Sequence, residues 1–166
     1  MVMIRRVLLN LFGGWFALPR SFPAATMRTI TGAIAEGERR HAGELRLAIE
    51  ARYSPWAVLA GMQTRERARD VFSLLRVWDT LDNSGVLLYL QLAERRVEIV
   101  ADRGIAARVD AGQWQQLCDL FASDMRGGAA DTAVLHCLGR INDLLTAHFP
   151  AGEDNPRELP DEPVVL

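Results

Sequence analysis

Three oxygen-bearing side chains stand at the two ends of one expected β-hairpin. Asp82 and Asn83 belong to a cluster of turn-forming residues before the apolar run 86–90, and Asp102 follows the alternating run 97–101. The connection between the two runs is short, which favours an antiparallel hairpin. The entry and the exit of such a hairpin lie at the same end of a sheet, so we expect these three side chains to lie close together.

The chemistry open to these side chains is cation binding. Carboxylate and amide oxygens are the ligands that hard cations such as Ca²⁺ and Mg²⁺ prefer. We therefore predict Asp82, Asn83 and Asp102 as metal ligands. Further contacts to a ligand at this end of the sheet are predicted from Asp79, Glu44, Arg103 and Gly104. A cation held here could polarise a phosphoryl oxygen and activate water, which is the chemistry of a metal-dependent phosphatase.

The same residues have a second interpretation that needs no ligand. Asp82 and Asn83 are common residues in tight turns, and Asp102 could pair with Arg103 or cap the helix that follows it. The spacing of an EF-hand calcium loop is absent from the sequence. The pattern leaves both interpretations open.

The other chemically active residues do not form a recognised catalytic set. The three histidines, His41, His136 and His148, have no partner at the spacing that two metal ligands on one helix need. Cys118 and Cys137 fall in expected helices, where they are predicted as buried thiols. Neither a phosphate-binding loop nor a Ser–His–Asp arrangement can be named, so we expect no organic cofactor.

A strand and a helix are expected to precede the hairpin and to position it. Apolar and polar residues alternate over 44–50, which predicts a half-buried strand, and Thr64 is expected to cap a helix that continues to Trp78. A strand, a helix and a strand in succession predict a parallel pair of strands. Further helices are predicted over 24–42, 105–109, 111–126 and 131–148. The expected fold class is therefore α/β, with a central mixed β-sheet and α-helices packed on both faces.

Length and charge limit the classes of function. The chain has 166 residues and a formal net charge of −2, which fits one domain without a strongly basic surface. Nucleic acid is therefore an unexpected partner. No segment reaches the roughly 20 apolar residues of a membrane-spanning helix. We expect a protein partner and a cytoplasmic location.

The N-terminal segment 1–22 is predicted to be an amphipathic helix that packs on the domain. It is basic and then apolar, as in a signal peptide, but Asn10 interrupts the apolar run. The alternative is export, with residues 1–25 acting as a signal peptide. Phe12, Trp15 and Phe16 could also allow residues 1–19 to contact a membrane surface as a peripheral segment.

Several separated blocks of this sequence, taken together, resemble the TPM domain family. These blocks are Phe22-Pro23, Gly43–Arg46, Asn83–Leu90, Val97–Ile105, Trp114 and His148–Pro150. The ending Asn155–Leu166 is similar to that of a soluble bacterial branch of the family. The resemblance divides the chain into an N-terminal segment 1–22, a TPM domain 23–150 and an irregular C-terminal tail 151–166.

The resemblance implies a TPM-type α/β/α sandwich, and it implies two classes of function. One is a binding or assembly and repair module, as in a photosystem repair factor, with a divalent-cation site at the sheet-end loops. The other is a metal-dependent acid phosphatase-like hydrolase of phosphate monoesters, since a plant member is described as an acid phosphatase and some members bind calcium. The sequence favours the binding module, because it lacks the dense carboxylate–histidine set that metal hydrolases usually assemble.

Overall fold

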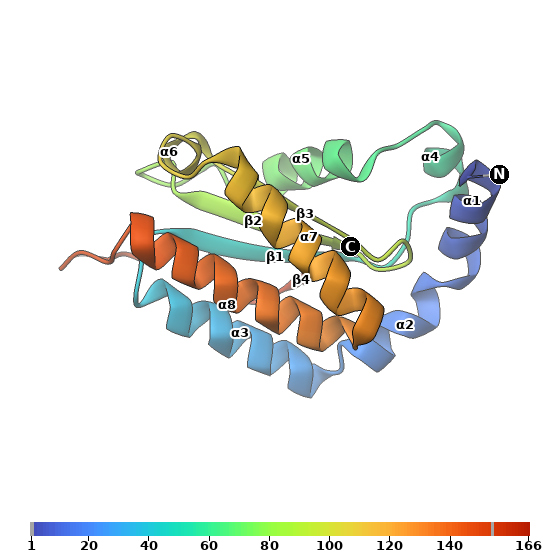
Figure 1. Cartoon of the computed structure of the whole chain (residues 1–166), viewed down its shortest axis with the longest axis horizontal. Helices are drawn as coiled ribbons and strands as arrows, with labels where there is room; N and C mark the ends of the chain where they lie inside the picture. Colours follow the sequence, from blue (N-terminus) through green and yellow to red (C-terminus); the bar gives the residue numbers. More distant parts are fainter. Residues whose placement is uncertain (1, 154) are drawn as a thin grey trace.

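A four-stranded sheet runs through the middle of the protein in the order β3-β2-β1-β4 (Figure 1). The computed structural model describes residues 2–153 and 155–166, without the side chains of residues 2 and 14–16. The expected contacts of Trp15 and Phe16 lie outside this description. The strands are β1 (Glu44–Glu50), β2 (Gly85–Gln91), β3 (Arg96–Ala101) and β4 (Val164–Val165).

The central hairpin and the parallel pair are confirmed. Strands β2 and β3 pair antiparallel, with Leu88 opposite Ile99, and β1 and β2 pair parallel, with Leu47 opposite Leu88. The sheet is therefore mixed, as the succession of apolar runs and turn residues predicts.

Helices cover both faces of the sheet, so the α/β fold with a central mixed sheet is confirmed. On one face, α3 (Ala24–Glu38), α7 (Ala111–Gly127) and α8 (Ala130–His148) enclose the larger core, in which Leu45, Leu88 and Phe121 are buried. On the other face, α4 (Pro55–Leu59) and α5 (Thr64–Leu74) enclose a smaller core around Leu87 and Tyr89. The remaining helices are α1 (Val2–Phe12), α2 (Gly14–Ser21) and α6 (Arg103–Ala106).

The prediction that β1 is half-buried is wrong, because all seven of its residues are buried. Its polar side chains lie under other segments of the chain rather than in solvent. Glu50 accepts two hydrogen bonds from Arg67 of α5, at 2.8 and 3.1 Å, and Arg46 donates to the backbone oxygens of Pro160 and Glu162 in the tail.

Helix boundaries differ from the predictions where a local backbone feature intervenes. Helix α5 has Gln63 at its N-cap, and Thr64 is its first residue, so the predicted cap lies one residue too late. The same helix ends at Leu74, and Arg76 follows with a φ of 53°, which stops the helix before the predicted end at Trp78.

The C-terminal tail is less irregular than predicted. Its end forms β4, which pairs parallel with β1 through Ala48 opposite Val164 and Ile49 opposite Val165. The tail thereby covers the edge of β1, an arrangement that protects an otherwise unpaired strand edge. No helix in the described part of the chain is long and apolar enough to span a membrane, as expected.

Candidate functional site

The two ends of the β2–β3 hairpin meet, as the sequence predicts. The backbone N–H of Asp102 donates to the carbonyl oxygen of Gly85 at 2.8 Å. The backbone N–H of Gly104 donates to the carbonyl oxygen of Asn83 at 3.1 Å. A Cβ at Gly104 would lie 2.3 Å from the carbonyl oxygen of Asp82, so only glycine permits this approach of the two loops. We call residues 79–85 and 102–104 the hairpin-end loops.

Arg103 lies between the side chains that were predicted to bind a metal. Its Nε donates to Oδ1 of Asn83 at 2.8 Å, and its backbone N–H donates to Oδ1 of Asp102 at 2.7 Å. Asp102 is the N-cap residue of α6, so the capping role that the sequence left open is present. Asn83 has a φ of 52°, a left-handed turn conformation that asparagine tolerates.

One oxygen of this cluster has no partner. Oδ2 of Asp102 is buried and accepts no hydrogen bond, whereas Asp82 and Asp79 are exposed at the surface of the neighbouring loop. Within residues 2–153 and 155–166, no group of three or more His, Cys, Asp or Glu side chains could hold a metal ion. A cation at the hairpin-end loops would therefore depend on amide or backbone oxygens in addition to carboxylates.

The carboxylate of Glu44 contacts the tail and not the side chains of the hairpin-end loops. The backbone N–H of Glu44 donates to Ser84 at 3.0 Å, but its carboxylate accepts hydrogen bonds from the backbone N–H groups of Glu158 and Leu159, at 3.1 and 2.8 Å. Burial raises the pKa of this carboxyl group. The structure thus brings together Asp82, Asn83, Asp102, Arg103 and Gly104, and it gives Glu44 a different role.

A buried acidic cluster beside Glu44 has no counterpart in the sequence predictions. Glu38, at the end of α3, accepts a hydrogen bond from the backbone N–H of Leu45 at 2.8 Å. Burial, with the nearby carboxyl groups of Glu44 and Asp161, raises the pKa of Glu38 to about 8. Glu38 and Glu44 are six residues apart, but Asp161 lies far along the chain, so the sequence spacing alone does not reveal the cluster.

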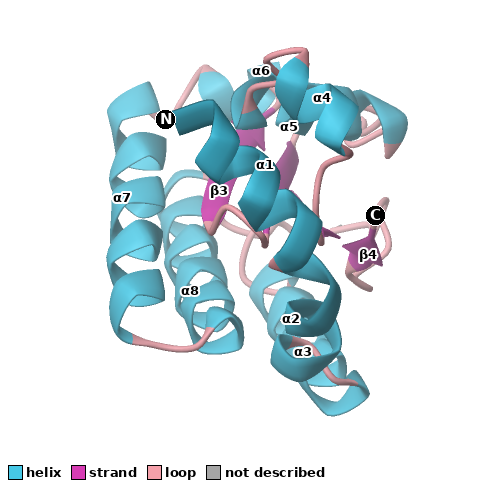
Figure 2. Cartoon of the chain, turned by 90° about the vertical axis from the view of Figure 1, so that its right-hand side faces the viewer, coloured by secondary structure: helices cyan, strands magenta, loops and turns pink. Residues whose placement is uncertain are grey.

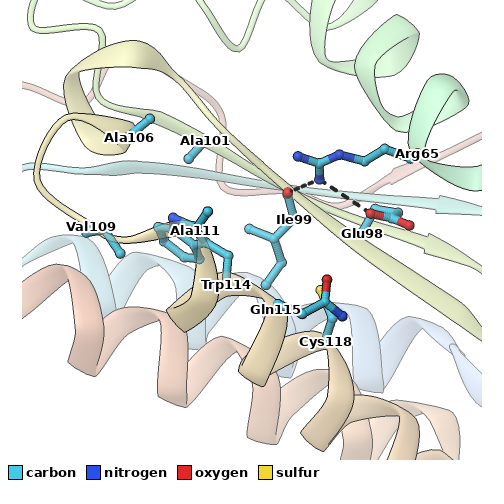
Figure 3. Close-up of a pocket in the computed structure, with 10 residues that line it drawn as sticks. All are labelled: Arg65, Glu98, Ile99, Ala101, Ala106, Val109, Ala111, Trp114, Gln115 and Cys118. Atoms are coloured by element: carbon cyan, nitrogen blue, oxygen red, sulfur yellow. Dashed lines mark hydrogen bonds and ion pairs between the residues drawn. The ribbon is translucent and has the colours of Figure 1, made fainter.

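A cavity of about 470 Å³ opens between β3, α5 and α7 (Figure 3). Arg65 crosses one side of it, where Nη1 donates to the carbonyl oxygen of Ile99 at 2.5 Å and lies 3.3 Å from Oε2 of Glu98. Trp114 and Cys118 of α7 form the opposite side. Burial raises the pKa of the Cys118 thiol to about 11, so it is held as a thiol and not as a nucleophilic thiolate.

The comparisons with known proteins agree with this architecture. The family model of the TPM domain matches residues 20–144. Among solved structures, the chain is similar to the NMR structure of the BA42 protein from the psychrophilic bacterium Bizionia argentinensis. The TM-score is 0.76 and the identity 24%, over 86% of this chain and 93% of that chain.

A second similar structure is the N-terminal domain of a protein from P. gingivalis, with a TM-score of 0.58 and 18% identity, over 80% of this chain and 83% of that chain. At these identities both likenesses show a shared fold. No curated protein matches the sequence. Because the family model matches most of the chain, the chain belongs to the TPM domain family.

Proposed function

We propose that this TPM domain is a binding module that contacts its protein partner with the hairpin-end loops. In this proposal a divalent cation, Ca²⁺ or Mg²⁺, is a weakly held part of that surface. The observation that carries the proposal is the unpartnered, buried Oδ2 of Asp102 in a loop pair that hydrogen bonds and Gly104 hold together. A buried carboxylate oxygen without a donor is costly, and a cation or a donor from a partner would satisfy it.

The residues fit a cation only in part. Asp82 and Asp102 would supply carboxylate oxygens, and Asn83 would supply an amide oxygen once Arg103 releases it. In the structure the Arg103 guanidinium already supplies the positive charge beside Asn83 that a cation would supply. This competition argues for weak binding, since each cation that enters must displace a hydrogen bond of 2.8 Å.

Binding is better supported than hydrolysis. A metal-dependent phosphatase needs a cation held firmly enough to activate water, together with a base that faces the substrate. The hairpin-end loops offer one unengaged buried oxygen and no histidine for this task. Hydrolysis of phosphate monoesters remains the alternative that the family resemblance implies.

An NMR titration of the purified chain with Ca²⁺ and then Mg²⁺ tests the proposal. We expect backbone amide shifts confined to residues 79–85 and 102–104. In Asp102→Asn, which keeps a capping oxygen but removes the charge, these shifts should require at least about tenfold more metal. Asp110→Asn is the matched control, because Asp110 also caps a helix through a 2.8 Å bond to the Gly112 N–H and lies elsewhere.

Two results would separate the candidate functions. Shifts without turnover of a phosphate monoester support the binding module. Metal-dependent turnover that is lost in Asp102→Asn but kept in Asp110→Asn would overturn it in favour of the phosphatase. An absence of shifts at saturating metal would remove the cation from the proposal.

A further inference from the structure

Helix α1 exposes most of its large apolar side chains to solvent, whereas Asn10 is buried and Val7 packs against the smaller core. We call the exposed large apolar side chains of this helix its apolar stripe, which consists of Met3, Ile4, Leu8, Leu11 and Phe12. Ile4 is 68% exposed and Phe12 is 74% exposed, whereas Asn10 on the opposite side is 1% exposed. A helix that only packs on a soluble domain has the reverse arrangement.

The inward side of α1 is anchored by polar contacts. Asn10 Oδ1 accepts hydrogen bonds from the backbone N–H of Tyr53 at 2.7 Å and from Nε2 of Gln91 at 2.9 Å. Arg6 Nε lies 3.0 and 3.1 Å from the two carboxylate oxygens of Glu94. These contacts fix the rotation of the helix, so its apolar stripe is held outward by the fold.

Helix α4, which neighbours α1, adds two exposed apolar side chains. Helices α1 and α4 lie side by side (Figure 2), and α4 exposes Trp56 and Leu59 by 79% and 50%. We call the stripe on α1 together with Trp56 and Leu59 the α1–α4 patch. Many exposed large apolar side chains on two adjacent helices indicate an interaction site, because monomeric proteins seldom expose many of them together.

The charged residues of the two helices are of one sign. Helix α1 carries Arg5 and Arg6 and no aspartate or glutamate, and α4 carries no charged residue. Glu94, the carboxylate that meets α1, is paired with Arg6 and its side chain is 4% exposed. Two copies of such a face would bring like charges together, whereas an anionic surface would complement it.

We infer that the α1–α4 patch docks on the surface of an anionic lipid bilayer. The apolar stripe and Trp56 would enter the region between headgroups and acyl chains, and Arg5, exposed beside the stripe, would remain among the phosphates. The helix would lie in the plane of the interface, with the TPM domain held behind it through Asn10 and Arg6. This surface is distinct from the hairpin-end loops.

Co-sedimentation of the full chain with vesicles tests this inference. We expect binding to vesicles of equal parts phosphatidylglycerol and phosphatidylcholine, little binding to phosphatidylcholine alone, and weaker binding as salt is raised. Leu8→Ser combined with Phe12→Ser should reduce the affinity at least about tenfold, because both side chains would leave the bilayer.

Matched control variants separate docking through the α1–α4 patch from nonspecific binding to vesicles. Leu81→Ser removes a side chain that is 81% exposed, but on a hairpin-end loop, and it should leave vesicle binding unchanged. Arg5→Glu should weaken binding to anionic vesicles, whereas Arg126→Glu, an exposed arginine of α7, should not.

The inference is overturned if the Leu8→Ser, Phe12→Ser variant binds anionic vesicles as well as the unmodified chain, or if the unmodified chain does not bind them. Self-association in solution that the same variant abolishes, without vesicle binding, would assign the patch to a second copy of the chain instead. Thermal unfolding of each variant shows that it is folded, and since the substituted side chains are exposed, we expect no loss of stability.

Discussion

The carboxylate of Glu44 accepts a 2.8 Å hydrogen bond from the backbone N–H of Leu159, and this bond joins the first residue of β1 to the C-terminal tail. The neighbouring N–H of Glu158 donates to the same oxygen at 3.1 Å. Beyond these two bonds the tail continues to β4, which pairs with the far half of β1. Glu44 therefore helps to position the strand that closes one edge of the sheet.

Replacement of Glu44 by alanine should loosen the tail. The change leaves two backbone N–H groups without an acceptor, and we expect a loss of about 1–3 kcal/mol in the free energy of unfolding at neutral pH. Urea denaturation measures the loss, and hydrogen exchange should show faster exchange at residues 158, 159 and 166. Glu36→Ala is the control, because its 2.8 Å pair with Arg39 is exposed and should contribute less than about 0.5 kcal/mol. Equal exchange rates in the two variants would contradict this role of Glu44.

The raised pKa of Glu38 predicts that stability falls as pH rises. A carboxyl group whose pKa is about 8 in the folded chain and 4.5 in the unfolded chain holds its proton more tightly when folded. Its contribution is complete below pH 4.5 and is lost as pH rises toward 8. Burial lowers the pKa of the nearby His41 below 6.5, which makes stability rise with pH in the lower range. The window from pH 6.5 to 8 therefore isolates the carboxyl groups.

Urea denaturation across that window measures the effect. We expect the free energy of unfolding to fall with pH by up to about 1 kcal/mol per unit, the limit for one proton being near 1.4. Glu38→Gln, which keeps an acceptor for the Leu45 N–H without titrating, should flatten most of the slope. Burial raises the pKa of Glu44 as well, so its titration changes the stability in the same direction. A slope that is unchanged in Glu38→Gln would contradict the assignment.

The contacts that the sequence could predict are those set by neighbouring residues. Turn residues before an apolar run place Asp82 and Asn83 at the start of the hairpin, and pairing then brings Asp102 beside them. The sequence did not predict that the Arg103 side chain would lie between Asn83 and Asp102, because this depends on a side-chain rotamer. Helices and strands with long apolar runs were found correctly for the same local reason.

Contacts between distant residues explain the rest. Strand β4 has two residues, and its pairing depends on the free edge of β1 more than on its own propensity. In the sequence, Asn10 only interrupts the apolar run of the N-terminal segment. In the structure it anchors α1 through hydrogen bonds to Tyr53 and Gln91, which lie far along the chain. Its environment could only be known from the fold.

Gly104→Ala should separate the hairpin-end loops. The added Cβ would lie 2.3 Å from the carbonyl oxygen of Asp82 and 2.7 Å from that of Asn83, so the backbone must shift. We expect a loss of about 1–3 kcal/mol in the free energy of unfolding, together with amide shifts at residues 82–85. Gly139→Ala is the control, since a Cβ there meets no atom within 4 Å and alanine favours helix α8 by up to about 1 kcal/mol. Two equally stable variants would show that the loops do not need this approach.

The two tyrosines of the chain predict a distinctive alkaline titration. Tyr89 donates to Oε2 of Glu50 at 2.5 Å, and the Tyr53 hydroxyl lies 3.1 Å from that of Tyr89. Burial raises the pKa of both phenols above their usual value of 10.0, so the stability they contribute is present below pH 10 and is lost as pH rises above it.

Phenolate absorbance should therefore appear only together with unfolding, in one cooperative step. Near-ultraviolet absorbance and far-ultraviolet circular dichroism, followed over the same pH series, should change with the same midpoint. Tyr53→Phe keeps the Tyr89–Glu50 bond and should still show no phenolate before unfolding. Titration of either phenol near pH 10 while the helices remain intact would contradict the burial of the two hydroxyl groups, because a buried phenolate without water is costly.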